Sequence, residues 1–221
     1  MTQQQLDSAY QWLCHQRKDY PPNADIWHFR FEWEKNKSRL LAEIVGDDYI
    51  FSPLKRLHKQ DGQVIHLWSS QDALVLKALA EPLQSQLKLS RSCTHLKGHG
   101  GLKQCVVGVQ QHLANYSFVC KTDVKSFYES IDQNVLIEKL YTHIEDSILR
   151  RYLYQVIHRA VEGGGNYREI TRGISRGCPL SPILGGLYLN VLDDLFSQKK
   201  NCYTTRYMDD ILIMTKTRWQ N

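Results

Sequence analysis

Residues 203–214 constrain the possible folds of this chain more than any other segment. Two extended, largely apolar runs, residues 203–208 and 211–214, flank the adjacent acids Asp209 and Asp210. Such runs around a short polar step predict a β-hairpin with both aspartates at its tip. Like charges side by side repel each other, so the pair favours a turn unless something positive lies between them. Taken alone, the pair also fits an ordinary solvated turn.

Two other segments carry residues that suit catalysis. Residues 118–123 form an extended stretch that ends in Asp123, and residues 176–182 (RGCPLSP) form a tight loop that leads into a helix. For that helix we expect Ser181 as the N-cap and Pro182 at the first helical position. If Asp123 lies on a strand beside the hairpin, three carboxylates meet at one edge of a sheet. Such a site suits Mg²⁺, and two ions ~3.5–4 Å apart can activate a 3′-hydroxyl and stabilise a leaving pyrophosphate.

The composition indicates a globular chain. Its 221 residues, 42% hydrophobic and 23% charged, suffice for the core of about one to one and a half domains. No apolar run approaches the ~20 residues of a membrane helix, and the N-terminus lacks the pattern of a secretory signal. Six scattered cysteines without a CxxC pair predict reduced thiols, so we expect a cytoplasmic protein with no membrane partner. The net charge of +5 is compatible with a polyanionic partner.

Helical and extended patterns alternate along the rest of the chain. Apolar positions at helical spacing predict an N-terminal helix through Leu6 and Leu13, followed by an aromatic-rich stretch that we interpret as core. Residues 55–59 and 64–68 predict a second hairpin, with an Asp-Gly turn over residues 60–63. Further helices are expected over residues 34–45, from Ser70 or Asp72 onward, and over residues 104–116, 130–144 and 148–161, and a short extended piece over residues 167–172.

Three motifs together resemble those of reverse transcriptases. Residues 207–210 (YMDD) between apolar strands resemble the YxDD box, and Asp123, with Phe127 and Tyr128 four and five residues later, resembles the first catalytic motif. Residues 177–182 (GCPLSP) resemble the GxPLSP motif of bacterial enzymes, especially of the group II intron and retron-type lineages. The order and spacing of the motifs agree as well, and the resemblance spans roughly residues 49–219.

The resemblance implies a metal site and its ligands. Asp123, Asp209 and Asp210 would be the catalytic carboxylates, and they would bind two Mg²⁺ ions, for which Mn²⁺ can substitute. The backbone carbonyl of Val124 would contact one of these metals.

The resemblance also implies nucleotide and template contacts. Tyr128 would be the steric gate that excludes the 2′-hydroxyl of a ribonucleotide, and a core aromatic is the alternative. Arg176 and Gly177 would lie under the templating base, where glycine lets the backbone approach closely. Lys97 and His99 lie in a flexible loop, and either a phosphate contact or a solvated loop fits them.

In the fingers, related enzymes hold the incoming triphosphate with a Lys and an Arg on a hairpin. Here Lys55, Arg56 and Lys59 lie on the first strand of the expected hairpin. Residues 64–68 (VIHLW) lack the Arg that group II enzymes carry on the second strand, so Arg56 or His66 is expected to substitute.

The fold implied is α+β: a right-hand polymerase fingers–palm fragment, whose small antiparallel palm sheet of about three to four strands packs on helices. We expect an N-terminal helical extension over residues 1–48, fingers with part of the palm over residues 49–117, and the palm with the catalytic motifs over residues 118–221. Eleven residues follow Asp210, so a thumb is expected to be absent. Polymerisation by this chain alone is then expected to be weak or absent.

The function implied is that of an RNA-directed DNA polymerase, which transfers dNMP from a dNTP to a primer 3′-hydroxyl. Its partners would be an RNA template, a DNA or RNA primer, dNTPs, and an accessory protein or a separate thumb domain. A non-catalytic nucleic-acid-binding or assembly module derived from such an enzyme is the alternative. An RNA-dependent RNA polymerase is disfavoured, because Tyr207-Met208 precedes the acids where those enzymes carry glycine. The biological system stays open between a retron, an intron, a CRISPR-linked system and antiviral defence. The motif sequences are closer to those of unclassified and defence-associated bacterial reverse transcriptases.

Overall fold

The structure, a computed structural model, describes residues 1–58 and 62–218 of the chain. Its fold is mixed α+β, as predicted. The helices are α1 (Gln3–Gln16), α2 (Asp25–Phe31), α3 (Trp33–Val45), α4 (Ser70–Gln86), α5 (Gly101–Leu113), α6 (Phe127–Ser130), α7 (Gln133–Tyr141), α8 (Ser147–Ile157), α9 (Ser181–Tyr188) and α10 (Asn190–Ser197). The strands are β1 (Leu54–His58), β2 (Val64–Leu67), β3 (Phe118–Thr122), β4 (Ala160–Gly163), β5 (Asn166–Glu169), β6 (Cys202–Tyr207) and β7 (Asp210–Thr215).

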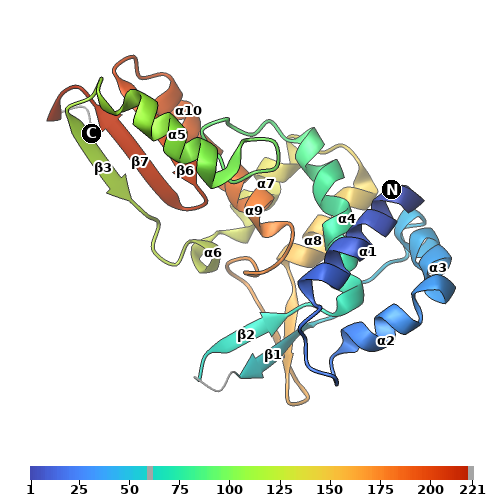
Figure 1. The fold of residues 1–221 in the computed structure, drawn as a ribbon. Coiled ribbons are helices and arrows are strands. Elements are labelled where there is room, and N and C mark those ends of the chain that lie inside the picture. Colours follow the sequence, from blue (N-terminus) through green and yellow to red (C-terminus); the bar gives the residue numbers. More distant parts are fainter. Residues whose placement is uncertain (59–61, 219–221) are drawn as a thin grey trace.

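One sheet contains the predicted hairpin with the two acids. It is antiparallel, with the order β3-β7-β6, so the strand of residues 118–122 lies directly beside β7. Helix α5 packs against Tyr203 and Thr205 of β6: the ring of His112 stacks on Tyr203 at 4.1 Å, and Cys105 contacts the Thr205 hydroxyl at 3.4 Å. Figure 1 shows this sheet at one end of the molecule, with the turn of the hairpin directed toward the centre.

A second sheet has the order β2-β1-β4-β5, and it joins residues far apart in sequence. Strands β1 and β2 form the predicted antiparallel hairpin, and β4 pairs in parallel with β1. Residues 59–61, which include Lys59 and the start of the predicted Asp-Gly turn, lie outside the described residues. Figure 1 shows the β1–β2 hairpin projecting away from the first sheet.

The N-terminal helices pack together beside α4, which they contact through α1 and α2. Leu6, Ala9 and Leu13 of α1 are buried, as their helical spacing predicts. The aromatic-rich stretch is core only in part: Trp33 is buried and stacks on Tyr10, but the Phe31 side chain is 85% exposed. The interpretation of that stretch as core is therefore wrong for Phe31.

Three of the expected helices have different bounds. Helix α8 ends at Ile157, and residues 160–163 pair with β1 and β5 instead of continuing the helix to residue 161. The helix expected over residues 130–144 is shorter: α7 begins at Gln133, after the extended residue Asp132 whose side chain caps it, and ends at Tyr141. Helix α5 begins at Gly101, before the expected residue 104.

Candidate active site

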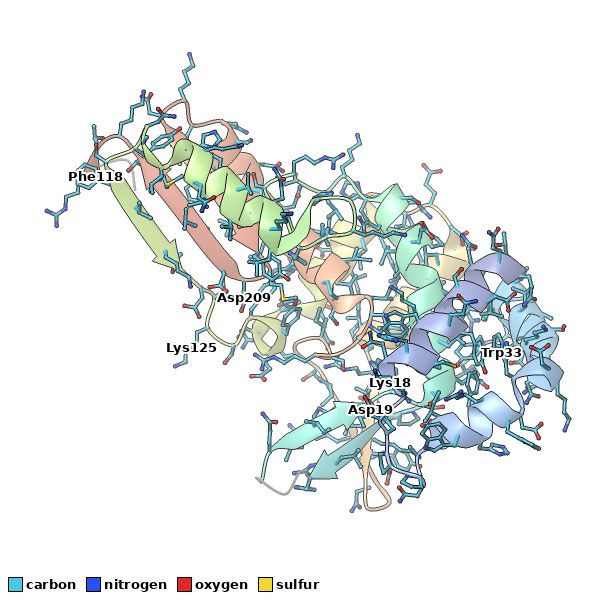
Figure 2. The ribbon with its side chains drawn as sticks, in the orientation of Figure 1. Lys18, Asp19, Trp33, Phe118, Lys125 and Asp209 are labelled. Atoms are coloured by element: carbon cyan, nitrogen blue, oxygen red, sulfur yellow. The ribbon has the colours of Figure 1, made fainter. Side chains whose placement is uncertain are left out.

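The two acids of the YMDD segment lie at the turn between β6 and β7. Tyr207 pairs with Asp210, which leaves Met208 and Asp209 as a two-residue loop. Met208 has a φ of 57°, a left-handed conformation that costs an ordinary side chain free energy and is typical of functional turns. Asp209 is half-buried and Asp210 is exposed. Figure 2 shows Asp209 at the inner end of the hairpin, toward the middle of the molecule.

Asp123 reaches the same edge of the sheet from β3. In the antiparallel register Thr122 lies opposite Ile211, and continuing it by one residue puts Asp123 opposite Asp210. Asp123 is exposed, and Val124 beside it is half-buried. Three carboxylates thus belong to one sheet edge, as the sequence suggests.

The carboxylates do not form a closed metal cluster in this conformation. Within residues 1–58 and 62–218, no group of three or more His, Cys, Asp or Glu side chains is arranged to hold a metal ion. One oxygen of Asp210 lies 3.4 Å from the Lys121 ammonium group, and both of these side chains are more than half exposed. An exposed ion pair of this kind is weak, so it gives Asp210 little preference for this partner.

Tyr128 lies close to the tip of the hairpin. Burial raises the pKa of its hydroxyl to about 12, and the negative charge of Asp209 adds to the shift, whereas Arg176 opposes it. The structure therefore brings together three of the residues singled out in the sequence. A Cβ atom on Gly185 would lie 3.3 Å from the Tyr128 ring and 2.9 Å from the Phe127 ring, so this glycine makes room for both aromatics.

The backbone at Gly173 packs against the backbone of Tyr128. The sequence analysis did not predict this role for Gly173. Its φ is +78°, and a Cβ at this position would lie 2.7 Å from the Tyr128 carbonyl oxygen. That carbonyl accepts a hydrogen bond from the amide of Ile174 at 2.7 Å. No residue but glycine fits so close to another backbone segment with this φ. A single glycine before a motif gives too weak a signal to reveal this role in advance.

The loop before α9 differs in one respect from the expectation. Ser181 is the first residue of the helix and not its N-cap, since Leu180 holds that position. The Ser181 hydroxyl instead donates a hydrogen bond of 2.6 Å to the Ser175 carbonyl and closes the loop on itself. Arg176 and Gly177 are exposed, and Gly177 has a φ of +76° with nothing within 4 Å of the place where a Cβ would lie. Another molecule can therefore approach the backbone of this loop closely at Gly177.

The two finger cations named above point to opposite faces of the β1–β2 hairpin. Arg56 lies opposite His66, and alternation along the strand places Lys55 on the other face. Lys55 lines a cavity of about 570 Å³ together with Tyr20 and Trp68. The two cations therefore cannot hold one triphosphate from the same face.

The Arg56 face carries a third basic residue that the sequence did not reveal. Burial and the nearby charges of Arg159 and Arg56 lower the pKa of His66. Arg159 is itself buried, and burial lowers its pKa to about 10. One of its guanidinium nitrogens donates to the carbonyls of Ile157 and Gly173, while Nε has no hydrogen-bond partner within the described structure. Arg56 and the buried Arg159 thus lie near His66, and Arg159 also contacts the segment before Gly177 through the Gly173 carbonyl.

A buried ion pair supports the hairpin from within. The guanidinium of Arg206 on β6 donates to both carboxylate oxygens of Asp193 on α10, at 3.0 and 2.5 Å. It also donates to the carbonyl of Met208 at 2.8 Å and to that of Gly186 at 3.2 Å. The Arg206 side chain is 1% exposed and that of Asp193 is 6% exposed. This pair links the hairpin to α9 and α10.

Comparison with known proteins identifies the family to which this chain belongs. Residues 65–220 match the family described as reverse transcriptase (RNA-dependent DNA polymerase). The chain therefore belongs to the reverse transcriptase family.

Individual relatives refine the lineage. The chain is 30% identical, over 78% of its length, to a protein of COX1/OXI3 intron 2 from Saccharomyces cerevisiae, of which it covers 21%. It is 24% identical, over 58% of its length, to the group II intron-encoded protein LtrA of Lactococcus lactis subsp. cremoris, of which it covers 20%. The chain thus spans about a fifth of the length of these relatives. The lineage is the one that the motifs suggest, that of group II intron-type reverse transcriptases.

Comparison with solved structures shows a similar fold in a known protein. A chain of a partial Cas6-RT-Cas1–Cas2 complex superposes with a TM-score of 0.54 at 18% identity, over 96% of this chain and 37% of the other. Together with the family match, this similarity confirms the fingers–palm type of fold.

Proposed function

We propose that this chain is the fingers and palm of an RNA-directed DNA polymerase. Residues 49–117 with β4 and β5 form the fingers, residues 118–221 contain the palm, and residues 1–48 are an N-terminal helical extension. The observation that carries the proposal is the convergence of Asp123, Asp209 and Asp210 on one sheet edge beside Tyr128. The reaction is the transfer of dNMP from a dNTP to a primer 3′-hydroxyl, with loss of pyrophosphate.

The donor set at the sheet edge fits a hard divalent cation. It consists of the oxygens of three carboxylates and of the Val124 carbonyl, without a soft ligand, which suits Mg²⁺, with Mn²⁺ as a substitute. When bound, two such ions would neutralise charge on the phosphates and favour the alkoxide form of the 3′-hydroxyl. The chain itself contributes the rigid strand ends that hold the ligands, and the exposed Lys121 contact leaves Asp210 accessible to a metal.

Nucleotide binding is assigned to the face of the hairpin that carries Arg56. Arg159 adds positive charge near this face, and burial together with the two arginines favours the neutral ring of His66, which can still form a hydrogen bond. A triphosphate is recognised there by charge-assisted hydrogen bonds. Tyr128, beside Asp209, is then the gate against a ribose 2′-hydroxyl, and Arg176 and Gly177 contact the templating nucleotide.

Replacing Arg56 tests which face binds the triphosphate. The Arg56→Ala variant is expected to raise KM for dNTP by about 10–100-fold, because charge-assisted hydrogen bonds to the phosphates are lost. Lys55→Ala is the matched control, since Lys55 is the adjacent cation on the opposite face. Steady-state incorporation kinetics would measure both. Equal effects of the two substitutions would contradict the assignment of the face.

Replacing Tyr128 tests the gate. The Tyr128→Val variant is expected to increase incorporation of rNTP relative to dNTP by about tenfold or more, because the ring no longer occupies the space of the 2′-hydroxyl. Tyr167→Val, an exposed tyrosine on β5, serves as the control. Single-nucleotide incorporation with each sugar measures the ratio. An unchanged ratio in Tyr128→Val would mean that the ring is only a packed aromatic.

The proposed activity is tested by primer extension on an RNA template with all four dNTPs and Mg²⁺ or Mn²⁺. The protein is used in excess over primer–template, so that duplex affinity does not limit the signal. Because excess protein compensates for weak duplex binding, we expect low yields of short extension products whose sequence is complementary to the template. No incorporation with either metal, on an RNA or a DNA template, would refute the proposal.

A non-catalytic nucleic-acid-binding or assembly module is the second candidate. The net charge of +5 favours it, because such a charge suits a polyanionic partner whether or not the chain transfers a nucleotide. This module would bind a primer–template with the same affinity with and without divalent metal and would add no nucleotide.

The cellular setting is also a proposal. The cytoplasm is the expected compartment, since all six cysteines are free. No helix in the described part of the chain is long and apolar enough to cross a membrane. The similarity to a chain from a Cas6-RT-Cas1–Cas2 complex supports an accessory protein as partner. A role in antiviral defence is proposed from the motif sequences alone. Co-purification of the chain with proteins of its own cell would identify such a partner.

A further inference from the structure

Met208, the residue before the two acids, is held at both of its backbone polar groups. Its amide N–H donates to Nδ1 of His95 at 2.9 Å, and its carbonyl accepts from the Arg206 guanidinium at 2.8 Å. Met208 also has the positive φ of 57°. Backbone in this region persists only where its surroundings determine it strongly. The two hydrogen bonds supply that constraint one residue before Asp209.

His95 connects the turn to a second motif. Its other ring nitrogen, Nε2, lies 3.0 Å from the carbonyl oxygen of Pro182, in the first turn of α9. Its ring also meets Tyr207 edge-on, with centroids 5.9 Å apart. The side chain thus contacts the YMDD segment on one side and the GCPLSP segment on the other.

The contacts determine the protonation state of the ring. Since the Met208 amide is a donor, Nδ1 must be the unprotonated acceptor, and the proton lies on Nε2, which donates to Pro182. Burial lowers the pKa of His95, and this favours the neutral ring. A histidine in this tautomer satisfies one donor and one acceptor at the same time.

The neighbouring backbone keeps His95 in place. Residues 92–94 run alongside the end of β6: the Arg206 amide donates to the Ser92 carbonyl at 2.8 Å, and the Thr94 amide donates to the Arg206 carbonyl at 2.9 Å. The Nδ1–H group of His99 donates to the Cys93 carbonyl at 2.9 Å, so His99 belongs to the same local structure. His95 is therefore presented from a segment that is itself attached to the hairpin.

We propose that His95 is a positioning residue, which fixes the Asp209-Asp210 turn relative to the loop and helix of residues 177–188 through its Met208 and Pro182 hydrogen bonds. This inference rests on the proposed polymerase function, because the turn matters for activity only if its acids bind metal. It adds a residue outside the three catalytic motifs. The hydrogen bonds of His95 go to Met208 and Pro182 and not to the acids, so its effect on the acids is exerted through Met208.

Two substitutions separate hydrogen bonding from packing. His95→Phe keeps the ring and its contact with Tyr207 but removes both polar atoms. His95→Asn loses the ring but keeps an oxygen at the position of Nδ1, which can accept the Met208 amide. If His95 only filled space, Phe would preserve activity better than Asn. The proposal predicts the reverse order.

The expected result is a loss of about 10–100-fold in kcat for His95→Phe, with KM for primer–template little changed, and a smaller loss for His95→Asn. Loss of a supporting partner beside metal ligands typically has this size. Retention of wild-type kcat in His95→Phe would overturn the proposal. A lower kcat for Asn than for Phe would overturn it as well.

An activity-independent measurement distinguishes this inference from the proposed function. Amide hydrogen exchange at Met208 by NMR is expected to be slow in the wild type and in His95→Asn, and at least about tenfold faster in His95→Phe. Long-range ¹H–¹⁵N correlations of His95 are expected to show the proton on Nε2. A wild type that shows this tautomer but incorporates no dNTP would refute the polymerase and leave the hydrogen bond established. A proton on Nδ1 would refute the positioning role even in an active enzyme.

Discussion

The Asp193→Ala variant is expected to lose about 3–5 kcal/mol of its free energy of unfolding, because the substitution leaves the buried charge of Arg206 without its carboxylate. Arg206 would keep its bonds to the carbonyls of Met208 and Gly186, but neutral oxygens do not balance a desolvated guanidinium. Urea unfolding followed by circular dichroism measures the change. A loss of this size is a large fraction of the stability of an ordinary domain.

The chain offers a matched control for this substitution in the next residue. Asp194 is exposed on the same helix, and Asp194→Ala is expected to change stability by less than about 0.5 kcal/mol. The double variant Arg206→Met/Asp193→Leu is expected to recover much of the loss, since neither charge is then buried. Similar losses for Asp193→Ala and Asp194→Ala would show that the buried pair does not support the hairpin.

The Asp123→Asn variant is expected to lose at least about 1,000-fold in the rate of dNMP incorporation, while its stability stays nearly unchanged. Asp123 is exposed and lies beyond the end of β3, so the fold does not depend on it. Metal ligands of a phosphoryl-transfer site contribute several kcal/mol of transition-state stabilisation, which corresponds to a rate factor of this order. Single-turnover primer extension with Mg²⁺ measures the rate.

Asp194→Asn is the control here as well, because it removes one exposed carboxylate, on α10, that is not part of the proposed metal site. It is expected to keep the wild-type rate and therefore to exclude an effect of net charge on nucleic-acid binding. Incorporation by Asp123→Asn at a tenth of the wild-type rate or more would contradict a metal-binding role for Asp123.

The part of the site that could be predicted lies on regular strands. Residues 203–214 consist of two extended, largely apolar runs around a polar step, so the hairpin and the position of its acids at the tip follow from local pattern alone. Residues 118–122 read equally well as a strand, and pairing with β7 places Asp123 beside Asp210. Because the three aspartates are adjacent to strand ends, prediction of the strands was enough to expect them at one edge of the sheet.

Other features depend on contacts that no local pattern encodes. Residues 158–161 continue the apolar spacing of α8, but pairing of β4 with β1, about a hundred residues away, determines their conformation. Likewise, Ser181 reads as a helix cap, but its hydroxyl finds the Ser175 carbonyl across the loop. Tertiary hydrogen bonds override the local preference in both places.

The roles of Arg159 and His95 could not be predicted from the sequence, because they too depend on tertiary contacts. Arg159 and His95 lie in segments that read as a helix end and a loop, and their roles arise from partners distant in sequence, Gly173 for one and Met208 for the other. Strand alternation does predict one further feature of the site. Lys55 and Arg56 are consecutive on a strand, so their side chains must lie on opposite faces of it.

The most direct test of the central claim is calorimetry of dTTP binding in the presence of Mg²⁺ or Mn²⁺. It compares the wild type with the Asp209→Asn/Asp210→Asn double variant, and unfolding curves check that both are folded. If the sheet edge is a polymerase site, the wild type binds dTTP only when the metal is present, and the double variant does not bind it. Metal-independent binding, or equal binding by both proteins, would contradict the assignment of these acids.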